Sequence, residues 1–231
     1  MKERLINLFG SSWFYQLEPY LLSKEFLKIG QTINQLREHK TIYPSSDKIF
    51  RIFKEVPYEK VNLMLLAMDP YPDGSGCGKA FCNCESLKLS PSLKIIFKEI
   101  EQEYPELTDR FEMPLGGLDM GDLGYLVKQG VFLLNTALTV EKSKPGSHMD
   151  LWKPFTLKVI ETLNKIEWIP WLLLGKKAQE LLPLINPKHS IICGLHPAAE
   201  IYKPGCGFIG SGIFRKVNFE LDKHKQKEIL W

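Results

Sequence analysis

The chain has 231 residues, of which 44% are hydrophobic and 25% charged, and this composition is ordinary for a soluble globular protein with one well-filled core. Its formal net charge of +3 neither demands nor opposes a nucleic-acid partner. No apolar run approaches the roughly 20 residues of a membrane span, and no secretory signal follows the charged start Lys2-Glu3-Arg4, so we expect neither a membrane helix nor export.

Helical periodicity marks residues 1–40, which we expect to form a helical segment packed on the rest of a single domain, residues 1–231. Two apolar faces carry this prediction, the first made by Trp13, Leu17, Tyr20 and Leu21, the second by Phe26, Ile29, Ile33 and Leu36. Tyr43-Pro44 breaks the pattern, and residues 49–53 suggest another short helix.

Four short apolar runs follow in the order of the chain. They cover residues 61–68, 131–134, 169–174 and 190–195. Continuous apolar runs of this length, separated by helix-sized segments, are typical of buried parallel strands. The sequence therefore predicts an α/β fold, a three-layer sandwich around a central four-stranded, mainly parallel sheet.

The segments between the runs predict the covering helices. Ser90-Pro91-Ser92 should start a helix that continues to about Tyr104, because Ser suits the cap and Pro the first turn. We expect a loop at residues 116–121, a crossover helix at 155–164 and another helix at 177–184.

Three polar residues stand at or just past the ends of these runs. They are Asp69, Asn135 and His196. Because ligands bind at the carboxyl ends of parallel strands, we expect a carboxylate, an amide and an imidazole to converge in one crevice. Taken singly, Asp69 to Gly74 can be an ordinary turn, Asn135 a helix cap and His196 a hydrogen-bonded loop residue. Their shared position favours a reaction centre.

The chain has five cysteines, and three of them cluster as Cys77, Cys82 and Cys84. A disulfide framework is not expected in a chain with this core and no export signal. The spacing of the cluster matches no zinc or iron–sulfur pattern, so we expect free thiols and no metal.

At this point the sequence resembles the family 1 uracil-DNA glycosylases, over roughly residues 40 to 220. Their first motif, Gly-Gln-Asp-Pro-Tyr-His-Gly, is matched by Asp69-Pro70-Tyr71, with Met68 for Gln and Pro72 for His. Four further segments match in order, namely 78–81, 90–93, 133–140 with Ser147-His148, and 196–197 with 207–210. The resemblance implies hydrolysis of the N-glycosidic bond of deoxyuridine that is flipped out of DNA, as in base excision repair.

Several residues depart from the family pattern, and the departures resemble one branch of the family. The last family motif, His-Pro-Ser-Pro-Leu-Ser, is here 196–201, with Ala198 for Ser and Glu200 for the Leu wedge. Pro72, Lys176 and Ala198-Ala199 look like the poxvirus branch, whose members also serve as a subunit of a polymerase processivity factor. A non-catalytic DNA-binding or polymerase-accessory protein is therefore the alternative function.

The resemblance assigns base recognition to four residues. Asn135 would read the 4-oxo and ring N–H of uracil, because its amide both donates and accepts. Tyr71 would exclude the methyl of thymine, and Phe81 would stack on the base, although either ring can equally be a packing aromatic. Met68 would contribute its main chain to substrate binding.

Two residues carry the expected chemistry. Asp69 would face the sugar cation and orient water, and His196 would donate to the 2-oxo oxygen of the departing uracil anion. No cofactor follows from this chemistry.

Seven residues are expected at the DNA: Pro72, Ser92, His148, Lys176, Ala198, Glu200 and Ile201. Ser92 can donate to a phosphate, whereas Glu200 would face a polyanion, leaving Ile201 as wedge and favouring single-stranded substrate. The lysines can equally form a solvated surface. We further expect a monomer that acts on uracil-containing DNA, single- or double-stranded, with a possible replication or polymerase partner. The expected location is intracellular: cytoplasmic for a bacterial or viral protein, with the nucleus as an option for a eukaryotic one.

Overall fold

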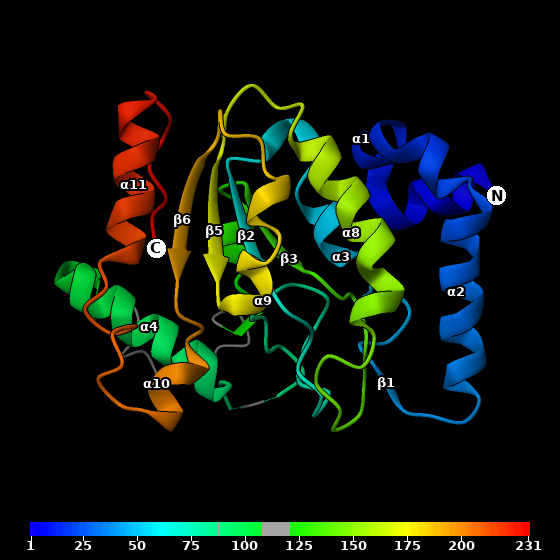
Figure 1. The fold of residues 1–231 in the computed structure, drawn as a ribbon, viewed down its shortest axis with the longest axis horizontal. Helices are drawn as coiled ribbons and strands as arrows, with labels where there is room; N and C mark the ends of the chain where they lie inside the picture. Colours follow the sequence, from blue (N-terminus) through cyan, green and yellow to red (C-terminus); the bar gives the residue numbers. More distant parts are fainter. Residues whose placement is uncertain (87, 108–120) are drawn as a thin grey trace.

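The computed structural model describes residues 1–86, 88–107 and 121–231. A four-stranded sheet lies at its centre, built from β2 (Leu63–Ala67), β3 (Val131–Asn135), β5 (Pro170–Leu174) and β6 (Ser190–Gly194). The strand order is β3-β2-β5-β6, and every pairing between them is parallel. The four apolar runs therefore form the predicted strands, with their carboxyl ends along one edge (Figure 1).

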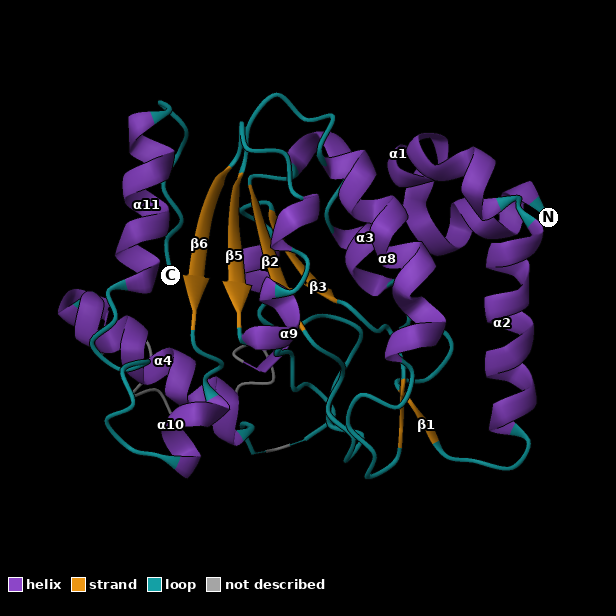
Figure 2. Ribbon diagram, in the orientation of Figure 1, coloured by secondary structure: helices purple, strands orange, loops and turns teal. Residues whose placement is uncertain are grey.

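Helices cover both faces of this sheet and give the three layers that the sequence predicts (Figure 2). Successive side chains of β3 point to opposite faces of the sheet and pack against different helices. Phe132 packs against Trp13 and Phe53 on one face, with ring centroids 4.8 and 5.2 Å away. Leu133 points to the other face, where it borders a small void lined by Phe97 and Phe214.

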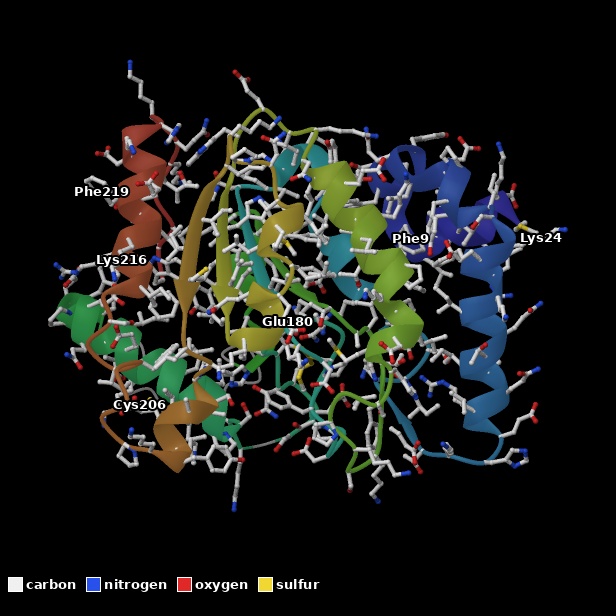
Figure 3. The ribbon with its side chains drawn as sticks, viewed as in Figure 1. Phe9, Lys24, Glu180, Cys206, Lys216 and Phe219 are labelled. Atoms are coloured by element: carbon white, nitrogen blue, oxygen red, sulfur yellow. A yellow bond between two sulfur atoms is a disulfide. The ribbon has the colours of Figure 1, made fainter. Side chains whose placement is uncertain are left out.

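The first face is covered by α1 (Lys2–Leu21), α3 (Arg51–Glu55), α8 (Met149–Leu163) and α9 (Lys176–Gln179). α2 (Lys24–Arg37) packs outside them, capped by Ser23, whose hydroxyl accepts from Phe26 N. The helical segment predicted for residues 1–40 thus consists of α1, which is interrupted at Gly10 (φ 74°), and α2. Phe9 of α1 lies inside the resulting aromatic cluster, in contrast to the exposed Phe219 (Figure 3).

The second face is covered by α4 (Pro91–Glu103), α7 (Gly124–Val127) and α11 (Ile213–Lys223). α4 begins as predicted, because Ser90 accepts from Leu93 N and Pro91 occupies the first turn. The C-terminus returns to this layer, where Trp231 packs on Phe214 at a centroid distance of 4.6 Å.

Two helix predictions need correction. The crossover helix begins at Met149, before the predicted residue 155, because it accommodates Pro154 within its length. The helix predicted over 177–184 divides into α9 and the 3-10 turn η3 (Leu182–Leu184), since Pro183 cannot donate the backbone hydrogen bond that would continue it.

The remaining elements are short. β1 (Ile42–Tyr43) and β4 (Val140–Glu141) form an antiparallel pair, η1 (Tyr58–Lys60) precedes β2, and η2 (Pro105–Leu107) follows α4. α10 (Ala198–Tyr202) follows β6. The loop predicted at 116–121 lies, up to residue 120, outside the described residues. Within the described ranges, no helix combines the length and apolar character that crossing a bilayer requires.

Candidate active site

A cavity of about 430 Å³ opens at the carboxyl ends of the strands. Residues at or just after the ends of β2, β3, β5 and β6 line it. Most of the predicted site residues line this cavity: Met68, Asp69, Tyr71, Pro72, Phe81, Ser92, Asn135, Lys176, His196 and Ala198. Because the parallel strands all end at this edge of the sheet, residues more than a hundred positions apart in the chain meet in one cavity.

Asp69 enters the cavity two residues after β2 ends. Its Oδ2 accepts a hydrogen bond from Gly146 N at 2.6 Å, and Pro72 O accepts one from Ser143 N at 2.9 Å. These bonds tie the Asp69 turn to the loop before α8. Burial raises the pKa of the Asp69 carboxyl, and the bond from Gly146 opposes this shift.

Asn135 is the last residue of β3 and pairs in register with Ala67. The next residues fix its position, because Thr136 N donates to Ala67 O and Ala137 N to Met68 O, each at 2.9 Å. The Asn135 side chain is 4% exposed, and its Oδ1 has no hydrogen-bond partner among the described residues. A buried acceptor without a partner is costly, so this oxygen is ready for a ligand N–H.

His196 lies on the opposite wall, after β6. Its Nδ1 accepts a hydrogen bond from Ala198 N at 3.1 Å, so Nδ1 carries no proton. Burial lowers the pKa of the imidazole, which favours the neutral ring. The single proton of that ring therefore sits on Nε2, and His196 can donate a hydrogen bond from Nε2 while remaining uncharged.

Tyr71 and Phe81 are held by the long loop after β2. Ser90 Oγ donates to the Tyr71 hydroxyl at 2.6 Å, and that hydroxyl lies 3.4 Å from Phe81 O. Phe81 has a φ of 61°, a left-handed conformation that is uncommon for a residue with a side chain. Its ring lies 5.6 Å from that of His196, centroid to centroid. Strain at a cavity wall is typical of a functional position.

Lys176 and Lys177 begin α9 at the rim and are both exposed. Gly175 precedes them with a φ of 92°, and a Cβ placed there would lie 2.9 Å from His196 Cβ. Only glycine lets β5 end this close to the imidazole. Lys177 also pairs with Glu180 at 2.9 Å, whereas Lys176 has no ion pair among the described residues.

Several known proteins similar to this chain are named uracil-DNA glycosylases. No family model matches the chain. Uracil-DNA glycosylase 1 of Listeria innocua is 33% identical over 227 residues, which span 95% of this chain and 96% of that protein. The chain belongs to the uracil-DNA glycosylase family. The enzyme of Streptococcus thermophilus is 35% identical, with coverage of 96% and 98%, and that of equine herpesvirus 2 is 34% identical, with coverage of 94% and 85%.

Solved structures support the same fold. Mimivirus uracil-DNA glycosylase superposes with a TM-score of 0.82 at 22% identity, covering 98% of this chain and 88% of that one. A Y322L variant of the mimivirus protein, solved in complex with UGI, gives the same TM-score at 23% identity, with coverage of 98% and 90%. The predicted α/β three-layer fold is therefore confirmed as the fold of this family.

Three of the residues predicted at the DNA do not line the cavity. His148 is buried at 5% exposure, and its Nδ1 lies 2.8 Å from Thr139 Oγ1, which also accepts from Trp152 Nε1. It therefore anchors the loop before α8. Ile201 lies beyond the rim with 44% of its surface exposed.

Glu200 requires a correction. We expected it to face the polyanion, but it is 8% exposed and its carboxylate turns inward. It accepts hydrogen bonds from Gly205 N and from Phe208 N, the latter at 3.2 Å, and contacts Cys206 Sγ. These donors lower the pKa of the carboxyl. The match to the last family motif put Glu200 at the wedge position. Its hydrogen-bond donors, however, come from the loop that follows α10 and folds back onto it.

Two rim residues escaped the sequence analysis. Tyr202 lines the cavity and is 88% exposed, and Lys177 stands beside Lys176. The signal that could have identified Tyr202 was its position two residues after Glu200, in the segment that matches the last family motif and its wedge.

The cysteine cluster also differs from expectation. We expected separate free thiols at Cys77, Cys82 and Cys84, but the three sulfurs converge in one group and all lie within 4.8 Å of one another. The spacing of the cysteines in the sequence could not reveal this convergence. It depends on the turns of the loop, where Gly78 and Phe81 have positive φ angles. Cys193 and Cys206 are free, as expected.

Proposed function

We propose that this chain is a monofunctional uracil-DNA glycosylase that hydrolyses the N-glycosidic bond of a flipped-out deoxyuridine. One observation carries the proposal: the Oδ1 of Asn135, which has no hydrogen-bond partner in the described part of the chain, lies in the same cavity as Asp69 and His196. Uracil carries an N–H next to a 4-oxo group, so one amide can satisfy both. Cytosine has no ring N–H at that place, and the buried oxygen would stay unpaired.

The aromatic residues supply the shape of the base site. The hydroxyl of Tyr71 is anchored by Ser90, so its ring cannot swing aside for a methyl group at the 5-position. Phe81 offers a face to the base from its fixed, left-handed backbone position. Met68 contributes through its carbonyl, which accepts from Ala137 N and Thr136 Oγ1 and so locks the loop that carries Asn135.

The chemistry follows from Asp69 and His196. As the bond from C1′ to N1 of uracil breaks, its electron pair leaves with uracil and the sugar becomes cationic. Ionised Asp69 stabilises this cation and orients the water whose oxygen then bonds to C1′. Neutral His196 donates from Nε2 to the 2-oxo oxygen, where the negative charge of uracil gathers. The proton lost by water balances the charge of the released base.

DNA contact is proposed at the rim of the cavity. We assign phosphate contacts to Ser92, in the first turn of α4, and to Lys176, which has no ion pair among the described residues, with Lys177 beside it. Pro72 and Ala198 add shape without a hydrogen-bond donor from the side chain. We assign the wedge that replaces the flipped base to Ile201 and Tyr202, the exposed residues of α10.

The finer features of the sequence remain proposals. The poxvirus-like resemblance rests on Pro72, Lys176 and Ala198-Ala199. The named relatives are bacterial and herpesviral glycosylases, so a purely accessory role is not favoured. A replication partner and a monomeric state rest on the sequence argument only. That residues 1–231 act as one unit is supported by the packing of Trp13 of α1 on Phe132 of the sheet.

The decisive experiment is release of free uracil from a uracil-containing oligonucleotide. We expect release by the wild type without added cofactor, none from cytosine, and slow thymine release by Tyr71→Ala. Tyr15→Ala, a change at an exposed aromatic residue on α1, is the matched control and should keep the wild-type preference. Failure of the wild type to release uracil, or thymine release by the wild type itself, would overturn the assignment.

A further inference from the structure

The three clustered cysteines form a feature that the glycosylase chemistry does not use. Their ligand atoms, one sulfur each, all lie within 4.8 Å of one another. Cys77 and Cys82 are fully buried, and Cys84 is partly buried. Cys77 is equidistant from the other two, with Cα separations of 5.9 Å in both cases. A sulfur forms one disulfide only, so no single disulfide accounts for this convergence, whereas one ion can bind all three sulfurs at once.

The surroundings favour thiolates over thiols. Cys77 N donates to Cys82 Sγ at 3.0 Å, and Arg51 Nη1 lies 3.4 Å from Cys84 Sγ. Hydrogen-bond donors and a guanidinium beside sulfur stabilise its anionic form. Thiolates are the ligands that zinc and other thiophilic metal ions prefer.

The charges near the cluster are otherwise balanced. Arg51 pairs with Glu55 and with Asp122, at 2.5 and 2.8 Å. The buried Lys79 ammonium pairs with the same two acids, at 2.9 and 3.1 Å. Two cations thus offset two anions, and nothing in this group offsets three additional thiolates. A divalent cation among the sulfurs would offset two of these three negative charges.

A fourth ligand stands close by. Asp122 Oδ1 lies 3.8 Å from Cys77 Sγ. Zinc bonds to sulfur and oxygen at about 2.3 and 2.0 Å, so two such ligands of a tetrahedral ion lie about 3.5 Å apart. Arg51 and Lys79 would hold the carboxylate in place as outer partners.

We propose that Cys77, Cys82 and Cys84 bind one thiophilic cation, with Zn²⁺ as the first candidate and Asp122 as the fourth ligand. Four protein ligands leave no open position, so the ion is structural. It would fix the loop that presents Phe81, because Cys82 follows Phe81 directly and also lines the cavity. The proposal concerns the metal alone and does not depend on the glycosylase reaction.

Metal content of the full chain tests this site. The reduced protein is loaded with Zn²⁺, unbound metal is removed by gel filtration, and the metal-to-protein ratio is measured. We expect about one equivalent for the wild type and for Cys193→Ser, which changes an exposed free cysteine. Cys77→Ser and Cys84→Ser should lose most of this metal. Equal retention by Cys77→Ser and the wild type would overturn the site.

Two measurements on the wild type remove any dependence on variants that fail to fold. Co²⁺ substitution should give thiolate-to-metal charge-transfer absorption together with the intense visible bands of a tetrahedral site. Thiol titration of the denatured, metal-free chain purified without reductant should find all five cysteines reduced. Two missing thiols, together with no metal uptake, would establish a disulfide in place of the metal. Five thiols with no metal uptake would establish simple thiols, and either result overturns the proposal.

Discussion

The loops after β2 and β6 face each other across the cavity but are held in place by different means. The loop after β2 is constrained by its backbone: a Cβ at Gly78 would meet Lys48 O at 1.9 Å, and Ala80 N donates to Leu133 O at 2.9 Å. The segment 198–215 after β6 is held by carboxylates. Glu200, Glu99 and Glu103 are all buried and accept hydrogen bonds from its backbone.

The two ways of holding these loops fit two different tasks, base recognition by the loop after β2 and display of exposed apolar residues by the segment after β6. Base recognition tolerates little movement, since an error of a fraction of an ångström admits the wrong base, and a loop with few accessible conformations provides that rigidity. The opposite segment must carry exposed apolar residues, Ile201 and Tyr202, which gain nothing from packing in the free protein. Buried carboxylates that accept hydrogen bonds from backbone N–H groups can hold such a segment in one conformation.

The largest expected effect comes from Asp69→Asn and His196→Ala in the cavity. Each removes one preorganised charge or donor from the site, which should lower the single-turnover rate of uracil release on the order of 10²–10³-fold or more. Thermal unfolding should change little for Asp69→Asn, because Asn can still accept from Gly146 N. Near-normal excision by both variants would place the chemistry elsewhere.

Glu200→Ala tests how far the second segment depends on a single acid. Gly205 N and Phe208 N would lose their acceptor, so α10 and the wedge residues should shift together. We expect a several-fold loss of excision from duplex DNA, with a smaller loss from single strands, which require no wedge. Glu161→Ala, at an exposed acid on α8 that pairs with Lys158, is the control. Initial rates on matched oligonucleotides decide, and unchanged duplex rates would show that Glu200 does not support the wedge.

Tyr202→Ala and Ile201→Ala divide the wedge between its two candidates. Extruding a base costs a few kcal/mol, and 1.4 kcal/mol of lost compensation slows excision roughly tenfold. Tyr202 borders the cavity and is more exposed than Ile201, so we expect its removal to lower the duplex rate more. Because Glu200 faces inward, the ground for expecting a single-strand preference in the wild type is removed. Equal duplex rates in both variants and the wild type would exclude α10 as the wedge.

Sequence reasoning succeeded where local pattern and topology suffice. The apolar runs at 61–68 and 131–134 predicted β2 and β3, and parallel pairing then brought Asp69, Asn135 and His196 to one edge. The Ser90 cap of α4 was equally readable, because its partner lies three residues away. In each case the determining contacts are either close in sequence or imposed by the sheet.

It failed where a polar side chain finds its partner through the tertiary fold. Glu200 and His148 were expected to face DNA, and both are buried against partners supplied by neighbouring loops. The convergence of Cys77, Cys82 and Cys84 depends on left-handed backbone at Phe81, which no propensity predicts for phenylalanine. The orientation of these side chains is set by the conformation of the loop that carries them, so it cannot be inferred from residue type.

The smallest expected effect is a pH dependence of stability that originates at Glu103. Burial raises the pKa of this carboxyl to about 7, and repulsion from Glu99 adds to the shift, while bonds from Phe214 N and Arg215 N oppose it. The folded state therefore binds a proton more tightly than the unfolded chain. The corresponding stabilisation is fully present below the ordinary glutamate pKa of about 4.3 and is lost as pH rises through about 7.

Chemical unfolding at a series of pH values measures this effect. Glu103→Gln should flatten the decline in stability between about pH 4.3 and pH 7, because its amide does not titrate. The slope is the readout, since the amide also changes the bonds to Phe214 N and Arg215 N at every pH. Glu106→Gln, at an exposed acid just beyond α4, should keep the wild-type slope. If Glu103→Gln keeps that slope as well, Glu103 is already ionised in the folded protein, and the segment after β6 is held by three charged acids.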